Sequence, residues 1–391
     1  MGIHEATELF RQSRGAAMGV RELQGPLEWD FLTTQIADLL GGRYDVGEPC
    51  GVEQIMGGYE NLSFAVYVRG DEGAREYFLR KYRCGTVADE IGFEHAFLSH
   101  LGRSRFGLSP RPIAARDGGT CAAVEELHDG EPVTRFFALF SFLEGEDRYA
   151  WFENPRRDIE LVSSARVLAR LHEASSDFEP GGSRRLQEPV LEFIPGLVPV
   201  FEECARRAGD TGFDREFLAH VERIDQVITL SRFDSGDLTR MPCFALHADY
   251  HAGNLKYAGD AVVGVFDFDD SKLDYRVFEI ALAVANMCTS WDPADDGALR
   301  FDKLALFVSA YQEEASHRSA PGPMNDTELA ALWRMIANAN LNLLSWEVVF
   351  FYSDREADVS EYLRWLRHHL RAMEFIEGHE GEIAAAVGAV R

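Results

Sequence analysis

The character of the chain changes once, near Leu143-Glu144-Gly145, and this change constrains the fold more than any other feature. Before it, the spacing of apolar residues predicts strands over 62–68, 77–82, 120–126 and 135–143 and one helix over 88–101. After it, helical spacing dominates over 158–173, 191–207, 214–232, 277–288, 301–316, 326–350 and 358–375, with one strand-rich segment over 244–268. We therefore predict an α+β protein of two lobes, a small β-rich lobe over 1–143 with a helical extension over about 1–45, and a larger, mainly helical lobe over 144–391. The cleft between the lobes is the expected site.

The net charge narrows the range of partners. The chain carries 65 acidic residues against 39 basic ones, a formal net charge of -26. This balance disfavours nucleic acid, because neutralising phosphates requires clustered Lys and Arg. It equally disfavours an anionic membrane surface. A cationic or amine-bearing substrate is compatible with it.

The whole chain has the features of a cytoplasmic protein. Its six cysteines are scattered without a CxxC pair, which is typical of reduced thiols. The first twenty residues include Glu5, Glu8, Arg11 and Arg14 and no uninterrupted apolar stretch, so we expect no secretory signal there. No run approaches the ~18 apolar residues of a membrane span, so we expect no membrane association.

The segment from His247 to Asn254 carries the most informative polar residues. It reads His-Ala-Asp-Tyr-His-Ala-Gly-Asn, and a hairpin turning at Ala258-Gly259-Asp260 then leads into Asp267-Phe268-Asp269. One short unit thus brings together an Asp, an Asn five residues later and an Asp at a strand end. Phosphoryl transfer needs such a set, because a carboxylate must orient and deprotonate the attacking hydroxyl, and hard oxygen ligands must hold Mg²⁺.

Each of these residues fits a role. Asp249 fits the catalytic carboxylate, while Asn254 and Asp267 fit the metal ligands, with Asp269 able to support or share a second metal. His247 is expected to brace the catalytic loop. An alternative is a zinc site of hydrolase type built from His247, Asp249 and His251, since histidine and carboxylate suit that metal. No further ligand cluster stands out elsewhere in the sequence to support this alternative.

The strand ending at Tyr82 offers a cation for nucleotide phosphates. Alternation places Arg80 on the face of Phe78 and Tyr82, with Lys81 on the opposite face. One of these two is predicted to bind the α- and β-phosphates. Glu94 lies within the apolar stripe of the helix over 88–101, and a carboxylate there is costly unless a cation meets it. We therefore predict that Glu94 pairs with Arg80 or Lys81.

The strands over 62–68 and 77–82 are predicted to form a hairpin that turns at Asp71-Glu72-Gly73, and a glycine pair precedes its first strand. The segment reads Gly57-Gly58-Tyr-Glu-Asn61, and glycines here would let backbone amides approach phosphates closely. An ordinary turn explains the pair equally well. The sequence contains no GxxxxGK[ST], which excludes a P-loop enzyme.

These residues resemble the aminoglycoside phosphotransferase and choline kinase superfamily, and within it most closely the type II homoserine kinase branch. The likeness covers roughly residues 50–350. The matching motifs are Gly57-Gly58-Tyr-Glu-Asn61, Leu79-Arg80, Leu168-Ala-Arg-Leu-His172, His247-Ala-Asp249 through Asn254, Gly264-Val-Phe-Asp267-Phe268, Ala281 and the neighbourhood of Asn286–Cys288.

The resemblance implies a protein-kinase-like fold and a kinase that uses Mg-ATP, or sometimes GTP, as cosubstrate. By resemblance Asp249 is the catalytic base, Arg80 the phosphate-binding cation with Glu94 as its helix partner, and Asn254 and Asp267 the metal ligands. The segment Ser141, Phe142 and Leu143 resembles the interlobe hinge whose backbone receives adenine. Family members act on small hydroxylated amines or alcohols.

The acceptor stays open, because the chain departs from the homoserine kinase pattern. Tyr250 to Gly253 replaces a shorter acidic loop, Glu279 stands where an Asp is usual, and 184–240 contains extra helical sequence. The acceptor could be homoserine, another amino alcohol, an antibiotic-like molecule or a sugar. A second alternative is a Ser or Thr side chain of a peptide in a natural-product pathway. A third is a pseudokinase-like nucleotide-binding module, which the intact Asp249, Asn254 and Asp267 argue against.

Overall fold

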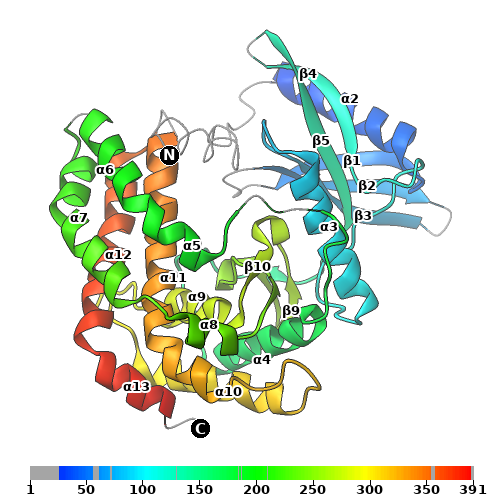
Figure 1. The fold of residues 1–391 in the computed structure, drawn as a ribbon. Coiled ribbons are helices and arrows are strands. Elements are labelled where there is room, and N and C mark those ends of the chain that lie inside the picture. The colour runs from blue at the N-terminus through cyan, green and yellow to red at the C-terminus, as the bar shows by residue number, and fades with distance from the viewer. Residues whose placement is uncertain are drawn as a thin grey trace.

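The computed structural model describes residues 26–55, 61–70, 73–128, 130–183, 185, 187–208, 210–353 and 357–388. It has two parts (Figure 1), an antiparallel sheet with two helices at one end and a group of helices at the other, with short strands between them. The β-rich N-lobe and helical C-lobe predicted from the sequence are both present. We propose that the boundary between the two lobes lies near Glu144-Gly145.

The N-lobe is built on a five-stranded antiparallel sheet in the order β1-β2-β3-β5-β4. The predicted hairpin is β2–β3, in which Leu62 pairs with Lys81 and Gly70 with Gly73. The elements of this lobe are α2 (Pro26–Arg43), β1 (Glu48–Ile55), β2 (Leu62–Gly70), β3 (Gly73–Lys81), α3 (Ala88–Arg103), β4 (Ala122–His128) and β5 (Glu131–Ser141).

The two faces of this sheet pack against different helices. One face buries Phe64, Leu79 and Leu139 with Ile36 and Leu40 of α2 in a separate apolar core. The other face carries alternate residues such as Ala138 and Phe140, which pack with α3 in the main core of the protein. Because neighbouring side chains of a strand point to opposite faces, this arrangement also decides which residues of β3 can reach the cleft.

The C-lobe surrounds a small set of strands with helices. Its strands are β6 (Glu146–Asp147), β7 (Cys243–Leu246), β8 (Leu255–Ala258), β9 (Ala261–Val265) and β10 (Lys272–Tyr275), paired as β6-β8-β9 and β10-β7. Its α-helices are α4 (Asp158–Ser175), α5 (Val190–Phe193), α6 (Leu197–Ala208), α7 (Gly212–Leu230), α8 (Ser235–Arg240), α9 (Arg276–Cys288), α10 (Phe301–Ser316), α11 (Asp326–Ser353), α12 (Val359–Gly378) and α13 (Glu380–Gly388), and its 3-10 turns are η1 (Ile194–Gly196), η2 (Ala252–Asn254) and η3 (Phe268–Asp270).

One predicted helix is wrong. The pattern over 191–207 predicts a single helix, but the chain forms α5, the 3-10 turn η1 and then α6. Pro195 lies within the turn, and its ring both lacks an N–H and clashes with the preceding helical turn. The other long helices form within a few residues of their predicted limits. None of the helices in the described ranges is both long and apolar enough to span a membrane.

Candidate active site

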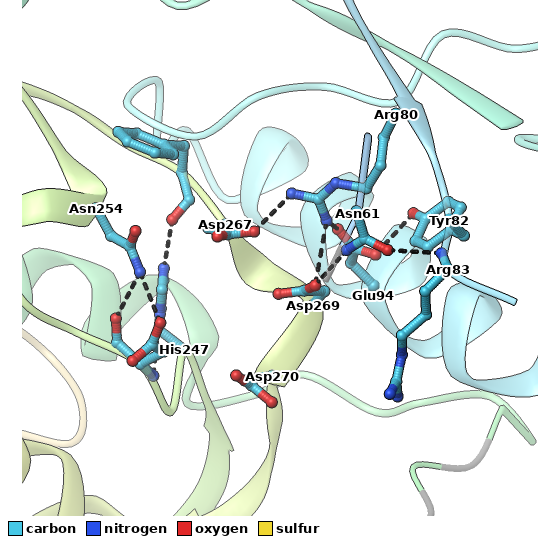
Figure 2. Close-up of polar contacts among 12 residues, drawn as sticks. Asn61, Arg80, Tyr82, Arg83, Glu94, His247, Asn254, Asp267, Asp269 and Asp270 are labelled. Carbon is cyan, nitrogen blue, oxygen red and sulfur yellow. Dashed lines mark hydrogen bonds and ion pairs between the residues drawn. The ribbon is translucent and has the colours of Figure 1, made fainter. Parts of the chain in front are cut away.

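The catalytic loop follows β7 and is held by its own backbone and side chains. The Nε2 atom of His247 donates to the carbonyl of Phe266 at 2.7 Å, and its Nδ1 accepts from the backbone N–H of Asp249 at 3.2 Å. The Nδ2 atom of Asn254 donates to both the carboxylate and the carbonyl oxygen of Asp249, at 2.8 and 3.0 Å. Two of the residues predicted to act together are therefore in direct contact, and Figure 2 shows the hydrogen bonds that leave the amide of Asn254.

His247 and His251 are engaged in ways that leave little room for a zinc site. Both ring nitrogens of His247 contact the backbone, as a bracing residue requires. The Nδ1 atom of His251 accepts from the N–H of Gly253 at 3.0 Å, and its Nε2 lies 3.4 Å from Oδ2 of Asp249. Because zinc binds a free imidazole nitrogen, the contacts of His247 argue against the zinc alternative.

A buried carboxylate whose role the sequence did not reveal, that of Glu279, supports the catalytic loop. Glu279, in the first turn of α9, accepts from the N–H of Ala248 at 2.5 Å and contacts Nε2 of His172 at 2.8 Å. Burial lowers the pKa of His172, so the neutral ring donates from Nε2 and accepts from Tyr311 through Nδ1. Ala248 has a left-handed φ of 66°, and Glu279 secures the N–H group of this strained residue.

Glu279→Ala should lower the free energy of unfolding by about 3 kcal/mol, because it leaves the N–H groups of Ala248 and His172 buried without acceptors. Urea denaturation would measure this change. The matched control is Glu313→Ala on α10, where an exposed ion pair with Arg166 is lost and the change should stay below about 0.5 kcal/mol. Equal effects in the two variants would contradict a bracing role for Glu279.

Asp267 lies two residues after the end of β9 and points toward the N-lobe. Its backbone is left-handed, with φ 66° and ψ 61°, a conformation that Asp tolerates better than most residues. The next residue, Phe268, anchors the turn between the rings of Phe97 and His247, at centroid distances of 5.9 and 4.5 Å. Asp267 Oδ1 then accepts from Nη2 of Arg80 at 2.6 Å.

Arg80 is the cation of the site. Its Nη1 atom donates to Oε1 of Glu94 at 3.0 Å, and Tyr82 donates to the other oxygen of Glu94 at 2.8 Å. The predicted ion pair is therefore present with Arg80 as the partner. Lys81, also predicted to bind the nucleotide, is turned to the other face of the sheet, where its Nζ lies 2.8 Å from Glu126. Because side chains alternate along β3, Lys81 points away from the face that carries Arg80. Its assignment to the nucleotide is therefore corrected.

Asn61 ties the two lobes together beside this ion pair. Its Nδ2 atom donates to Oδ2 of Asp269 at 2.8 Å, and its Oδ1 accepts from the N–H of Arg83 at 2.9 Å. Asp269 Oδ2 also lies 3.8 Å from Nη1 of Arg80. Gly57 and Gly58 lie outside the described residues, so their predicted phosphate contacts stay a prediction.

The carboxylates have different electrostatic environments. Burial and the neighbouring carboxylate of Asp269 raise the pKa of Asp267 well above its ordinary value, despite Arg80. Burial also acts to raise the pKa of Asp269, but Arg80 and Arg185 outweigh it and hold that pKa low. Burial again opposes ionisation of Asp249, yet His251 and the hydrogen bond from Asn254 lower its pKa to about 2. Asp249 is therefore a carboxylate at neutral pH.

The residues present fit a magnesium ion. Asn254 is buried and donates its amide hydrogens to Asp249. No described residue donates a hydrogen bond to its Oδ1. Asp267 and Asp269 place two like charges beside each other, a repulsion that a divalent cation relieves. Amide and carboxylate oxygens are the ligands that Mg²⁺ prefers. Within the described ranges no group of three or more His, Cys, Asp or Glu side chains could hold a metal by itself.

The predicted hinge is only partly available to a ligand. The N–H of Ser141 donates to the carbonyl of Arg111 at 2.9 Å, and its Oγ accepts from the N–H of Arg111 at 2.9 Å. Phe142 and Leu143 make no backbone hydrogen bond with any described residue. An adenine ring would therefore meet the backbone of Phe142 and Leu143 rather than that of Ser141.

The two lobes, with the cation on one side and the loop carboxylates on the other, define a protein of protein-kinase-like fold. A solved amicoumacin kinase in complex with AMP-PNP and Ca²⁺ matches 88% of this chain over 93% of its own, with a TM-score of 0.61 and 17% identity. A choline kinase from Cryptosporidium parvum matches 90% of this chain over 98% of its own, with a TM-score of 0.57 and 15% identity. At these identities both show the fold alone.

The family follows from the sequence comparison. A model of the phosphotransferase enzyme family, APH, matches residues 51–315. The chain belongs to this family. A homoserine kinase of Rhodopseudomonas palustris is 28% identical to it over 368 residues, which cover 92% of this chain and 98% of that protein. The predicted resemblance is thereby confirmed at the level of the family.

Proposed function

We propose that this protein transfers the γ-phosphoryl group of Mg-ATP to the hydroxyl group of a small amino alcohol, with homoserine as the first acceptor to test. The observation that carries the proposal is the placement of four side chains: Asp249 and Asn254, in contact on the catalytic loop, and Asp267 after β9, in contact with Arg80 of β3. Glu94 of α3 pairs with Arg80. Family membership supports the reaction type.

In this proposal Asp249 orients the acceptor hydroxyl and accepts its proton. Despite its burial, His251 and Asn254 hold the pKa of Asp249 low, which makes this carboxylate a weak base. The proton therefore moves late, once the bond to the leaving oxygen is largely broken. Arg80 neutralises negative charge on the phosphates, and Glu94 is a positioning residue that keeps its guanidinium in place. Most of the rate enhancement then comes from positioning and electrostatics.

Asn254 and Asp267 would hold the magnesium ion, with Asp269 beside them. When bound, Mg²⁺ supplies positive charge that stabilises the transferring phosphoryl group. A protein with one or two carboxylates usually completes its Mg²⁺ site with nucleotide phosphates, which agrees with the absence of a three-ligand cluster among the described residues. The neighbour solved with AMP-PNP and Ca²⁺ supports a nucleotide and a divalent metal as the pair to test.

Homoserine is favoured as acceptor because the homoserine kinase of Rhodopseudomonas palustris matches 92% of this chain. The identity of 28% is modest, so the experiment must compare acceptors. We would follow transfer of labelled γ-phosphate from ATP in the presence of Mg²⁺ to homoserine, other amino alcohols, aminoglycosides, sugars and Ser/Thr peptides.

The expected result is transfer to homoserine or a close analogue, with no label when Mg²⁺ is chelated. Label found only on a peptide would mean that the acceptor is a Ser or Thr side chain and not a small amino alcohol. Binding of Mg-ATP without transfer to any acceptor would favour a nucleotide-binding module, and no binding of ATP would overturn the proposal altogether.

A further inference from the structure

A cavity lies where the ends of α3 and α4 meet the loop between α10 and α11. It has about 950 Å³ of empty volume, part of it open to solvent, which is within the size range of small-molecule sites. Its lining shares no residue with the candidate active site. Since α3 belongs to the N-lobe and the other elements to the C-lobe, a molecule bound in this cavity would contact both lobes.

Three arginines line this cavity, and each comes from a different segment. Arg105 follows α3, Arg170 lies near the end of α4, and Arg318 lies in the loop after α10. The protein as a whole has a formal net charge of -26, so three guanidinium groups around one cavity are not explained by the composition of the chain. Guanidinium groups gathered in this way attract anions.

The donors of these arginines are not all used by the protein. Arg105 and Arg170 are exposed, and neither forms a hydrogen bond or an ion pair with another residue in the described ranges. Arg318 pairs with Glu173 at 3.1 Å and with Glu314, but its Nε atom is buried without a hydrogen-bond partner in the described part of the chain. The cavity therefore offers N–H groups that an oxyanion could accept from.

The acceptors of the lining, in contrast, already have partners. The carboxylate of Glu173 accepts hydrogen bonds from Arg318 and from the backbone of the next residue, at 3.1 and 3.4 Å. Asp177 and the carbonyl of Ala174 both face Nε2 of His100, at 3.0 and 2.9 Å. The groups of the lining that lack a partner are therefore cationic, which favours an anionic ligand over a cationic one.

The backbone at Arg105 is a separate observation. Its φ is 62°, in the left-handed region, and it follows Ser104, the C-cap of α3. The N–H of Phe106 donates to the carbonyl of Leu101 at 3.0 Å. This is the Schellman arrangement, in which the left-handed residue is usually Gly, because a side chain is strained there. An arginine at this position thus lowers stability relative to Gly, and its place in the cavity lining supplies a reason for its presence.

We infer that this cavity binds a small organic polyanion, a molecule with two or more carboxylate or phosphate groups, through Arg105 and Arg170 with Arg318 beside them. The planar fork of a guanidinium matches both kinds of oxyanion, and arginines from separate segments can bind separate anionic groups of one molecule. The inference is independent of the proposed phosphoryl transfer. The competing explanation is structural: basic residues at the ends of α3 and α4 offset the partial negative charge of the helix termini.

The test is calorimetric titration of the whole protein with two probes, tricarballylate, which has three carboxylates, and fructose 1,6-bisphosphate, which has two phosphates. Each titration is repeated with Mg-AMP-PNP present, since a polyanion could also bind at Arg80 in the nucleotide site. Acetate at equal ionic strength measures any general effect of salt. At least one probe should bind with a stoichiometry of one, both with and without Mg-AMP-PNP, and more tightly than acetate.

Arg105→Gly and Arg170→Gln should each weaken binding of that probe about 10- to 100-fold, as expected for lost hydrogen bonds to a charged group. Arg105→Gly should leave the Tm of the unliganded protein unchanged or higher, because Gly adopts the left-handed conformation without strain. The matched control is Arg166→Gln, which makes the same charge change one turn earlier on α4. Arg166 pairs with Glu313 and does not line the cavity, so this variant should bind the probe like the wild-type protein.

Weaker binding in the two cavity variants, with normal binding in Arg166→Gln, would support the inference. Equal losses in all three variants would show an effect of net charge alone and overturn it. Unchanged affinity in Arg105→Gly and Arg170→Gln would also overturn it, and a lowered Tm of the unliganded Arg170→Gln protein would then assign that arginine to the helix terminus. Displacement of the probe by Mg-AMP-PNP would place the polyanion in the nucleotide site, which again contradicts the inference.

Discussion

Asp249→Asn should lower kcat by about 10³-fold, the middle of the range for a lost general base, while nucleotide affinity stays close to that of the wild-type protein. The amide cannot take the hydroxyl proton, but its oxygen can still accept the hydrogen bond that Asn254 donates to Asp249. The loop should therefore keep its conformation. Single-turnover transfer of γ-phosphate would measure the rate, and calorimetric titration with Mg-ATP the affinity.

The control for this variant is Asp147→Asn. Asp147 is a carboxylate that follows the hinge segment in the chain, but it is largely exposed and pairs with Lys256 on β8, so its loss should change kcat less than about twofold. If Asp249→Asn turned over at a rate near that of the wild-type protein, Asp249 could not be the base. If it lost nucleotide binding as well, its role would be structural.

The sequence predicts the site well where the contacts are local in the chain or follow from the alternation of side chains along a strand. Glu94 in an apolar stripe requires a cation, and Arg80 meets it at 3.0 Å. The alternation of β3 removes Lys81 from the same site. Asp249, Asn254 and Asp267 lie within one loop and hairpin, so the turn at Ala258–Ala261 suffices to bring them together.

Contacts between distant segments could not be predicted. The hydrogen bond from Asn61 to Asp269 joins residues 208 positions apart, and the contact of Glu279 with Ala248 depends on where α9 packs. A single sequence gives periodicity but not the relative placement of elements. For the same reason the sequence could not predict that the N–H of Ser141 donates to the carbonyl of Arg111. This hydrogen bond depends on how the segment around Arg111 packs beside β5. The break at Pro195 is different, because the ring alone was sufficient reason to predict it.

Asp267→Ala should abolish measurable turnover, a loss of at least about 10³-fold, because the variant lacks both a carboxylate for the metal and the charge that faces the phosphates. The enhancement of ATP affinity by Mg²⁺ should disappear with it. Because Ala tolerates the left-handed φ of 66° at this position poorly, Asp267→Asn is the companion variant, which keeps the shape of the side chain and the backbone preference. Titration of each variant with ATP, with and without Mg²⁺, would measure the effect.

Asp260→Asn provides the control, since Asp260 lies at the tip of the same β8–β9 hairpin and pairs with Arg157 at the surface. It should retain both turnover and the Mg²⁺ enhancement. Asp267 contacts Arg80 as well, so a variant could lose activity merely by releasing that arginine. The Mg²⁺ dependence separates the two roles: a slow enzyme that still binds ATP more tightly with Mg²⁺ would make Asp267 a partner of Arg80 alone. The metal would then have to be held through Asp269, which already faces the same arginine at 3.8 Å.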